Sequence, residues 1–139
     1  MYREFKKSPN VLYSIIFINF LMCLYGFWVS YIDDYVTLCI LWSLLFVFSS
    51  LNQGHVLSNA VTRIGDISCA VAICVLYCIM YRINLNFWHI LSAIIAITLF
   101  LTAHIFLDRL TLYQYVVTIN LWHMWVIVQV WSIRKDRSD

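Results

Sequence analysis

The sequence predicts an all-α integral membrane protein, a single domain built from a bundle of about five transmembrane helices over residues 1–139. Its composition is the first reason, since 63% of the residues are hydrophobic and only 12% are charged, about half the charged fraction of an ordinary soluble domain. The second reason is that the apolar residues form five long runs, at residues 11–32, 35–51, 58–81, 85–107 and 110–133. A short soluble chain could not bury this much apolar surface in one core, whereas lipid accepts it.

The first run, 11–32, contains no ionisable residue and follows a charged segment that includes Lys6 and Lys7. It is longer than the apolar region of a cleavable signal peptide, and no pair of small residues at its end provides a cleavage site. We therefore expect this run to stay in the protein as its first membrane anchor.

The later runs differ in length. The second, 35–51, is short for a membrane span, and the fully apolar part of the third covers only 67–81. A helix that reaches back to residue 58 would be long enough, but it includes Arg63 and Asp66, so the third run is the weakest predicted span. The fourth and fifth runs are long enough to cross. All five should be α-helices, because an isolated spanning segment must satisfy its own backbone hydrogen bonds.

Five spans divide the ends and loops between two sides. Face A holds the N-terminus and the loops after the second and fourth runs, and face B holds the other two loops and the C-terminus. The basic residues of face A are Arg3, Lys6, Lys7, Arg63 and Arg109, and those of face B are Arg82, Arg134, Lys135 and Arg137. The positive-inside rule does not separate five charges from four, so orientation stays open.

Ionisable side chains gather at the helix ends of face A. They are His55, Arg63, Asp66, His104, Asp108 and Arg109. The first interpretation is an interfacial ring of charges in which Arg63 pairs with Asp66, three positions away on one helix. The second is a metal site with nitrogen ligands from His55, His104 and His123. The third is a proton or ion path through titratable side chains.

His123 differs from this group because it lies far from the ends of the fifth run. About 13 residues precede it in that run, which places it roughly 20 Å along a helix and close to the middle of a membrane. Ionisable groups at such depth usually face the protein interior. A hydrogen bond to Asn19, Thr98 or Asn120 would satisfy a neutral imidazole there.

Small residues give two further expectations. The five cysteines all lie within apolar runs, and none forms a Cys-x-x-Cys pair, so we expect them to serve as small packing residues. The pairs Ser68/Ala72 and Ser92/Ala96 would let backbones approach closely, and they predict a tight contact between the third and fourth helices.

One stretch resembles a known family. Residues 49–55 end the second run with Ser-Ser-Leu-Asn-Gln-Gly-His, Asp66 follows at the head of the third, and Leu121-Trp122-His123 lies in the fifth. This pattern resembles the CREST membrane hydrolases, which include alkaline ceramidases and adiponectin-type receptors. That family usually has seven helices, and its last helix carries a His-x-x-x-His pair, whereas Ile119 precedes His123 by four positions in this chain.

The resemblance implies specific roles for four residues. His55 and His123 would be zinc ligands, with His104 as a further ligand, and Asp66 and Ser50 would hold the water that attacks a lipid amide. Zinc is the only cofactor implied, and only in this interpretation.

The leading functional expectation is nevertheless non-enzymatic. The chain would act through helix packing, as a subunit of a larger membrane complex or as a lysis or immunity factor of phage or plasmid type. Its partners would be the lipid bilayer and other membrane subunits or itself, and no basic stripe suits a nucleic acid. The alternatives are a minimal CREST-like zinc-dependent lipid amidase and, third, a proton-conducting, ion-conducting or carrier protein.

Overall fold

Five helices make up the regular structure of the residues that the structure describes. The computed structural model describes residues 9–53, 60–81, 87–105 and 112–135, and every regular element among them is helical. The helices are α2 (Pro9–Ile32), α3 (Val36–Gln53), α4 (Ala60–Met80), α5 (Phe87–Ile105) and α6 (Leu112–Lys135). Each apolar run identified in the sequence overlaps one of these helices, so the all-helical fold class is confirmed.

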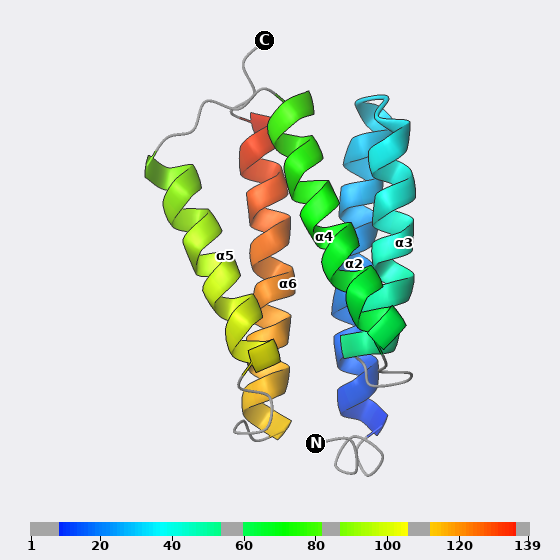
Figure 1. Ribbon diagram of the computed structural model, residues 1–139, viewed down its shortest axis with the longest axis vertical. Coiled ribbons are helices and arrows are strands. Elements are labelled where there is room, and N and C mark those ends of the chain that lie inside the picture. The colour runs from blue at the N-terminus through cyan, green and yellow to red at the C-terminus, as the bar shows by residue number, and fades with distance from the viewer. Residues whose placement is uncertain (1–8, 54–59, 82–86, 106–111, 136–139) are drawn as a thin grey trace.

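The helices stand side by side and alternate in direction (Figure 1). Helices α2, α4 and α6 begin at the end of the bundle that carries the N-terminus, which is face A, and they finish at face B. The closest packing joins α4 to α3, α3 to α2, α2 to α6 and α6 to α5. In the part of the chain described here, α2 therefore lies in the middle of the series, between α3 and α6, and α5 packs mainly on α6.

The predicted pairing of the third and fourth helices is wrong for the described residues, because α4 packs on α3 and α5 packs on α6. Gly65 explains the first pairing: a methyl group added there would meet the Phe48 ring at 2.6 Å, so only glycine lets these helices come so close. Trp125 of α6 holds α5 in place, since its indole nitrogen donates to the Ser92 carbonyl of that helix at 3.0 Å. Gly65 thus permits a close approach that the predicted small pairs did not indicate, whereas Ser92, a member of one predicted pair, contacts α6 instead of the third helix.

A very short turn joins α2 to α3. The amide of Asp33 donates to the Val29 carbonyl at 3.0 Å, and the amide of Tyr35 donates to the Ser30 carbonyl at 2.9 Å. Asp34 has a φ of 61°, a left-handed conformation that aspartate tolerates better than most residues. The turn therefore stops α2 and reverses the chain within three residues.

Three helices are long and apolar enough to cross a membrane, over Tyr13–Ile32, Ala60–Met80 and Tyr113–Lys135. The apolar helical stretches of α3 and α5 are shorter in the described residues, at Val36–Asn52 and Phe87–Ala103. By length and composition, the helix of the third run is thus one of the three that could cross a membrane. Its helix reaches back past Asp66 because that residue is accommodated inside the bundle.

The outer surface of the bundle is apolar on every helix. Every helix has at least one large apolar side chain that is more than half exposed. Examples, in helix order, are Phe17, Ile40, Val71, Ile97 and Val128. Continuous exposure of this kind is not sustained by a soluble monomer. Together with the three long apolar helices, it fits a membrane protein.

Candidate functional site

The buried polar residues are concentrated in the part of the bundle nearer face A. They are Asn19, Ser49, Asn52, Thr62, Asp66 and His123, which we call the polar half, although His123 lies near the middle of α6. Ser30, the other fully buried polar residue of the described chain, lies near the opposite end. In an apolar environment a buried polar group is costly unless it forms a hydrogen bond. The partners of these side chains therefore show which helices they connect.

Asn19 links α2 to α3. Its amide nitrogen donates to the hydroxyl of Ser49 at 2.7 Å and to the hydroxyl of Ser50 at 3.0 Å. Asn19 is fully buried, whereas Ser50 is only half-buried. The consecutive serines near the end of α3 therefore present two acceptors to a single amide.

Asp66 is the only fully buried carboxylate among the described residues. The amide nitrogen of Asn52 donates to its Oδ2 at 2.9 Å, which joins the last turn of α3 to the second turn of α4. Arg63 is exposed on α4, whereas Asp66 has no exposed surface. The interfacial ring in which Arg63 pairs with Asp66 is therefore wrong in its placement of Asp66, which belongs to the interior.

Buried side chains of three helices lie within electrostatic range of the Asp66 carboxylate. They are the hydroxyl of Tyr115 on α6 and the thiols of Cys23 on α2 and Cys69 on α4. The hydrogen bond from Asn52 of α3 is the direct contact that the structure gives for this group.

His123 is completely buried on α6, as predicted for an imidazole at that depth. It lies against Trp122, with the two ring centres 5.1 Å apart. One turn nearer to face A, the amide of Asn120 donates to the hydroxyl of Ser14 at 3.4 Å, which links α6 to α2.

The opposite half of the interior, which we call the aromatic half, is built from Gly26, Trp42, Tyr77 and Tyr81. The Trp42 indole fills the space above Gly26 so closely that an added methyl group would overlap the ring. The indole nitrogen donates to the Tyr77 hydroxyl at 3.3 Å, and Tyr77 stacks on Tyr81 with ring centres 5.1 Å apart.

An ion pair closes the aromatic half at face B. Arg134, at the end of α6, binds both oxygens of Asp33, with Nε to Oδ2 at 3.1 Å and Nη2 to Oδ1 at 3.3 Å. The hydroxyl of Tyr81 donates to the same carboxylate at 2.6 Å. The α2–α3 turn, the end of α4 and the end of α6 are thereby joined at one point.

The predicted site residues are only partly brought together in the described chain. Ser50 and Asp66 both lie in or beside the polar half, and His123 is buried at its upper edge. His55 and Asp108 lie outside the described residues, as does the side chain of His104. Among the side chains that the structure does describe, no group of three or more His, Cys, Asp or Glu residues is arranged to hold a metal ion. The zinc ligand set stays a prediction.

Two contributors to the polar half were not recognised as site residues from the sequence. In the sequence Asn52 lies among the polar residues that follow the second run and has no assigned role, and nothing local distinguishes Tyr115 from the other tyrosines. A usable signal existed for Asn19, which interrupts the first run with an amide that the bilayer would not tolerate alone. The interactions of Asn52 and Tyr115 depend on which helices pack together, which no local pattern shows.

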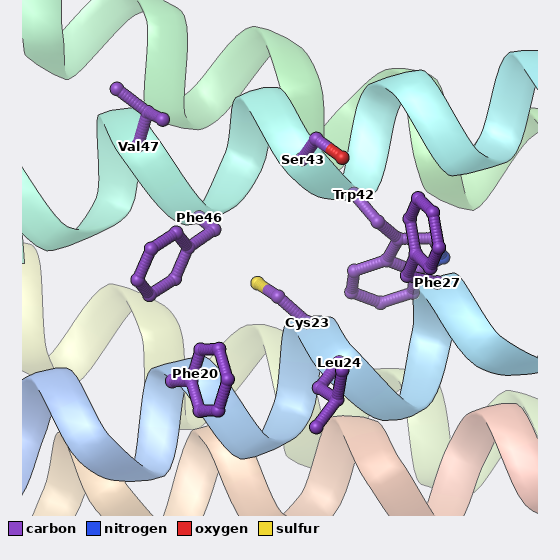
Figure 2. A pocket seen from close by; sticks show the side chains of 8 residues that line it. All are labelled: Phe20, Cys23, Leu24, Phe27, Trp42, Ser43, Phe46 and Val47. Carbon is purple, nitrogen blue, oxygen red and sulfur yellow. The ribbon is translucent and has the colours of Figure 1, made fainter.

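An apolar groove of about 300 Å³ runs along the outside of α2 and α3. Figure 2 shows the Cys23 sulfur in its floor, flanked by Phe20 and Phe46 on one side and by Trp42 on the other. The two phenylalanine rings meet edge to face with centres 5.6 Å apart. Apart from Ser43 and the Cys23 thiol, the groove is lined by apolar side chains.

No protein-family model, no curated protein and no solved structure matches this chain. The residues described above are therefore the basis for inferring its function.

Proposed function

We propose that the chain is an integral membrane protein whose five helices all cross the bilayer, and that it is a non-catalytic subunit of a membrane complex. The observation that carries this proposal is that the buried polar contacts connect different helices. Asn19 holds α2 to α3, Asn52 and Asp66 hold α3 to α4, and Asn120 holds α6 to Ser14 of α2.

Interhelical hydrogen bonds hold helices together in lipid, where burial of apolar surface does not itself drive helices to associate. The contacts near the opposite end have the same character, since Trp42 links α3 to α4 and Arg134 links α6 to the α2–α3 turn. The polar side chains that resemble a site thus also account for how a small bundle stays assembled.

The outer face of α4 is the surface that we assign to a partner. It is apolar, with Val71, Val75 and Ile79 at least half exposed, and it also presents the thiols of Cys74 and Cys78. The expectation that the cysteines are small packing residues stays a prediction for these two, whose packing partner would be the helix of another subunit. Helix α4 packs mainly on α3, so this face is open to a transmembrane helix of another subunit.

The two exposed thiols provide the experiment. The protein would be treated in its own membrane with a lipid-soluble maleimide that carries a diazirine, which the exposed thiols bind, then irradiated so that the carbene inserts into bonds of any adjacent chain, purified in mild detergent and analysed for covalent partners by mass spectrometry. We expect a crosslinked subunit that disappears in the double variant Cys74→Ser/Cys78→Ser. The matched control Cys23→Ser/Cys69→Ser changes two buried thiols and should retain the product. A monomer with freely alkylated Cys74 and Cys78 and no crosslink would contradict the proposal.

The five-span topology has a separate test. An odd number of crossings places the two chain ends on opposite sides, whereas failure of α3 or α5 alone to cross would place them on the same side. Epitope tags added before Met1 and after Asp139 would be exposed to protease in sealed vesicles. Cleavage of only one tag is expected, and cleavage of both or neither from one side would contradict five spans.

A CREST-like zinc-dependent lipid amidase is the second candidate. The observation in its favour is that Ser50 and Asp66, which the resemblance assigns to the attacking water, lie in or beside the same buried polar half. Three protein ligands with an open position for water is the usual arrangement of catalytic zinc. Metal analysis of the purified protein decides this candidate: about one zinc per chain, lost in His123→Ala, is expected for an amidase, and the subunit proposal requires none.

A further inference from the structure

We propose that the bundle is matched to a thin bilayer, with a hydrocarbon core of about 27 Å where the usual value is about 30 Å. The inference rests on the proposed function, because it takes the bundle to cross a membrane, and it specifies the kind of membrane. Three observations carry it: the levels of the exposed tyrosine and tryptophan rings, the length of α3, and the positions of exposed basic residues.

Exposed tyrosine and tryptophan side chains lie only near helix ends in the described residues. Each is within four residues of an end of its helix, and they are Tyr13, Trp28, Tyr31, Trp88, Tyr113 and Trp131. Nearer the middle of the helices, Trp42, Tyr77 and Trp122 are buried. Phenylalanine, which has no polar atom, is exposed farther inside α2, at Phe17 and Phe20. Since rings with a polar group prefer the boundary between membrane and water, the exposed rings mark two interfaces.

The two interfaces have the same separation on two different helices. On α2, Tyr31 near face B follows Tyr13 near face A by eighteen positions, and on α6, Trp131 follows Tyr113 by eighteen positions. At a rise of about 1.5 Å per residue, each pair is separated by about 27 Å along its helix. Tilting a helix shortens the distance that it covers across the bilayer, so the separation of the interfaces does not exceed this value.

Helix α3 has the length that this separation requires. It contains 18 residues, from Val36 to Gln53, which correspond to about 27 Å. Asp34 is exposed directly before it, and its last turn includes the buried amide of Asn52. A hydrocarbon core of about 30 Å would draw these polar ends into the apolar layer, whereas α3 crosses a core of about 27 Å without that cost.

Exposed basic residues lie at both ends of the apolar surface. Arg63 is exposed in the first turn of α4, directly before the exposed Ile64, and seventeen positions or about 25 Å separate it from Met80 at the end of that helix. Lys135 is exposed at the end of α6, with its amine 4.9 Å from the centre of the Trp131 ring. Cations at these levels complement the phosphate groups of lipids. The surroundings that fit this surface are therefore apolar chains between two layers of phosphate.

The test compares bilayers of different thickness. The full chain is reconstituted in phosphatidylcholine vesicles with monounsaturated acyl chains of increasing length, whose hydrocarbon cores range from about 22 to about 34 Å. Thermal unfolding is followed with a fluorogenic maleimide that reacts with the buried thiols of Cys23 and Cys69 once they become accessible. The variant Cys74→Ser/Cys78→Ser is the background, because these two thiols are exposed in the folded protein.

We expect the unfolding temperature to be highest in cores of about 24–27 Å and to fall by about 5 °C in the thickest bilayer. A maximum at about 30 Å or above, or an unfolding temperature that does not depend on thickness, would overturn the inference. The terminal tags described above are read in the same vesicles. Tags on the same side would overturn the five-span topology, and a maximum near 27 Å would then still support the thickness that α2 and α6 indicate.

Two matched double variants test whether the aromatic rings set the preferred thickness. Tyr13→Trp/Tyr113→Trp keeps a polar ring at each position and should leave the maximum unchanged. Tyr13→Leu/Tyr113→Leu lengthens the apolar surface toward face A and should move the maximum to a bilayer a few Å thicker. Both side chains are largely exposed, at 65% and 78%, so neither pair of substitutions disturbs the packing of the interior. The same maximum for both variants would overturn the assignment of these rings to the interface.

Discussion

Two guanidinium nitrogens of Arg134 donate hydrogen bonds to the carboxylate of Asp33, which lies 101 residues earlier in the sequence. The Asp33 side chain is 7% exposed, and that of Arg134 is 35% exposed, so the pair lies where the bundle meets its surroundings. Because Tyr81 donates to the same carboxylate, loss of this one contact would loosen three helix ends at once. The pair is thus the closing contact of the bundle at face B.

Replacing Arg134 with Gln should destabilise the protein by about 1–3 kcal/mol, because it leaves a largely buried carboxylate without its cation. Unfolding in a titration of denaturing detergent measures this. The double variant Arg134→Gln/Asp33→Asn should lose less than the sum of the two single variants. Lys135→Gln is the control, because it removes the positive charge next to Arg134 in the sequence. The Lys135 amine lies 4.9 Å from the centre of the Trp131 ring, and we expect its loss to change the free energy of unfolding by less than about 0.5 kcal/mol. Equal losses for the Arg134 and Lys135 variants would show that the ion pair contributes little.

Gly26→Ala should destabilise the bundle, although alanine is normally better than glycine in a helix by about 1 kcal/mol. The new methyl group would overlap the Trp42 ring, and overpacking of this kind costs about 1–3 kcal/mol. Thermal unfolding in mild detergent gives the difference. A smaller ring in Gly26→Ala/Trp42→Phe should restore part of the loss, and a single variant as stable as the parent protein would show that α2 and α3 can separate freely.

Asn19→Leu should cost about 0.5–2 kcal/mol, the range observed for interhelical polar contacts in membranes. The substitution removes the donor to Ser49 and Ser50 while keeping an apolar side chain of similar size. Ser43→Ala is the appropriate comparison, because its hydroxyl bonds only within α3, to the Cys39 carbonyl at 3.0 Å. We expect the Ser43 variant to unfold at the same detergent fraction as the parent, and similar losses for both would argue that Asn19 does not join the helices.

The variants Asp66→Asn and Asp66→Leu should distinguish the contribution of the hydrogen-bond acceptor at Asp66 from that of its negative charge. Asparagine keeps an oxygen that accepts the hydrogen bond from Asn52, so we expect a change within about 0.5 kcal/mol. Leucine leaves the buried Asn52 amide without that acceptor and should cost about 1–3 kcal/mol. Unfolding of the two variants in parallel measures the difference. A large loss in both would mean that the negative charge itself stabilises the bundle.

The elements of this fold are visible in the sequence, because an apolar run in lipid has to satisfy its backbone as a helix. The interior position of His123 follows from the same reasoning, since a deep imidazole is stable only against protein. The length of α4 was less apparent, because Arg63 and Asp66 interrupt its apolar character. Only the packed bundle shows that one of them points outward and the other inward.

The pairing of helices was not accessible in the same way. Small residues occur on several faces, and the sequence does not reveal that Gly26 meets Trp42 and Gly65 meets Phe48. The contacts of the polar half could not be predicted for the same reason, because Asn52 reaches Asp66 only once α3 and α4 have packed antiparallel. Local spacing identified candidate residues, and tertiary packing determined which of them share one interior.

The short turn through Asp33, Asp34 and Tyr35 also has a consequence for the order of assembly. Bringing α2 and α3 together closes a loop of three residues, so the entropy lost in pairing them is small. The contacts of α6 with α2 span more than a hundred residues, between Ser14 and Asn120 and between Asp33 and Arg134. During synthesis, α2 and α3 can thus meet as a helical hairpin while the rest of the chain is still being made. The last helix then completes both ends of the bundle in a single docking step.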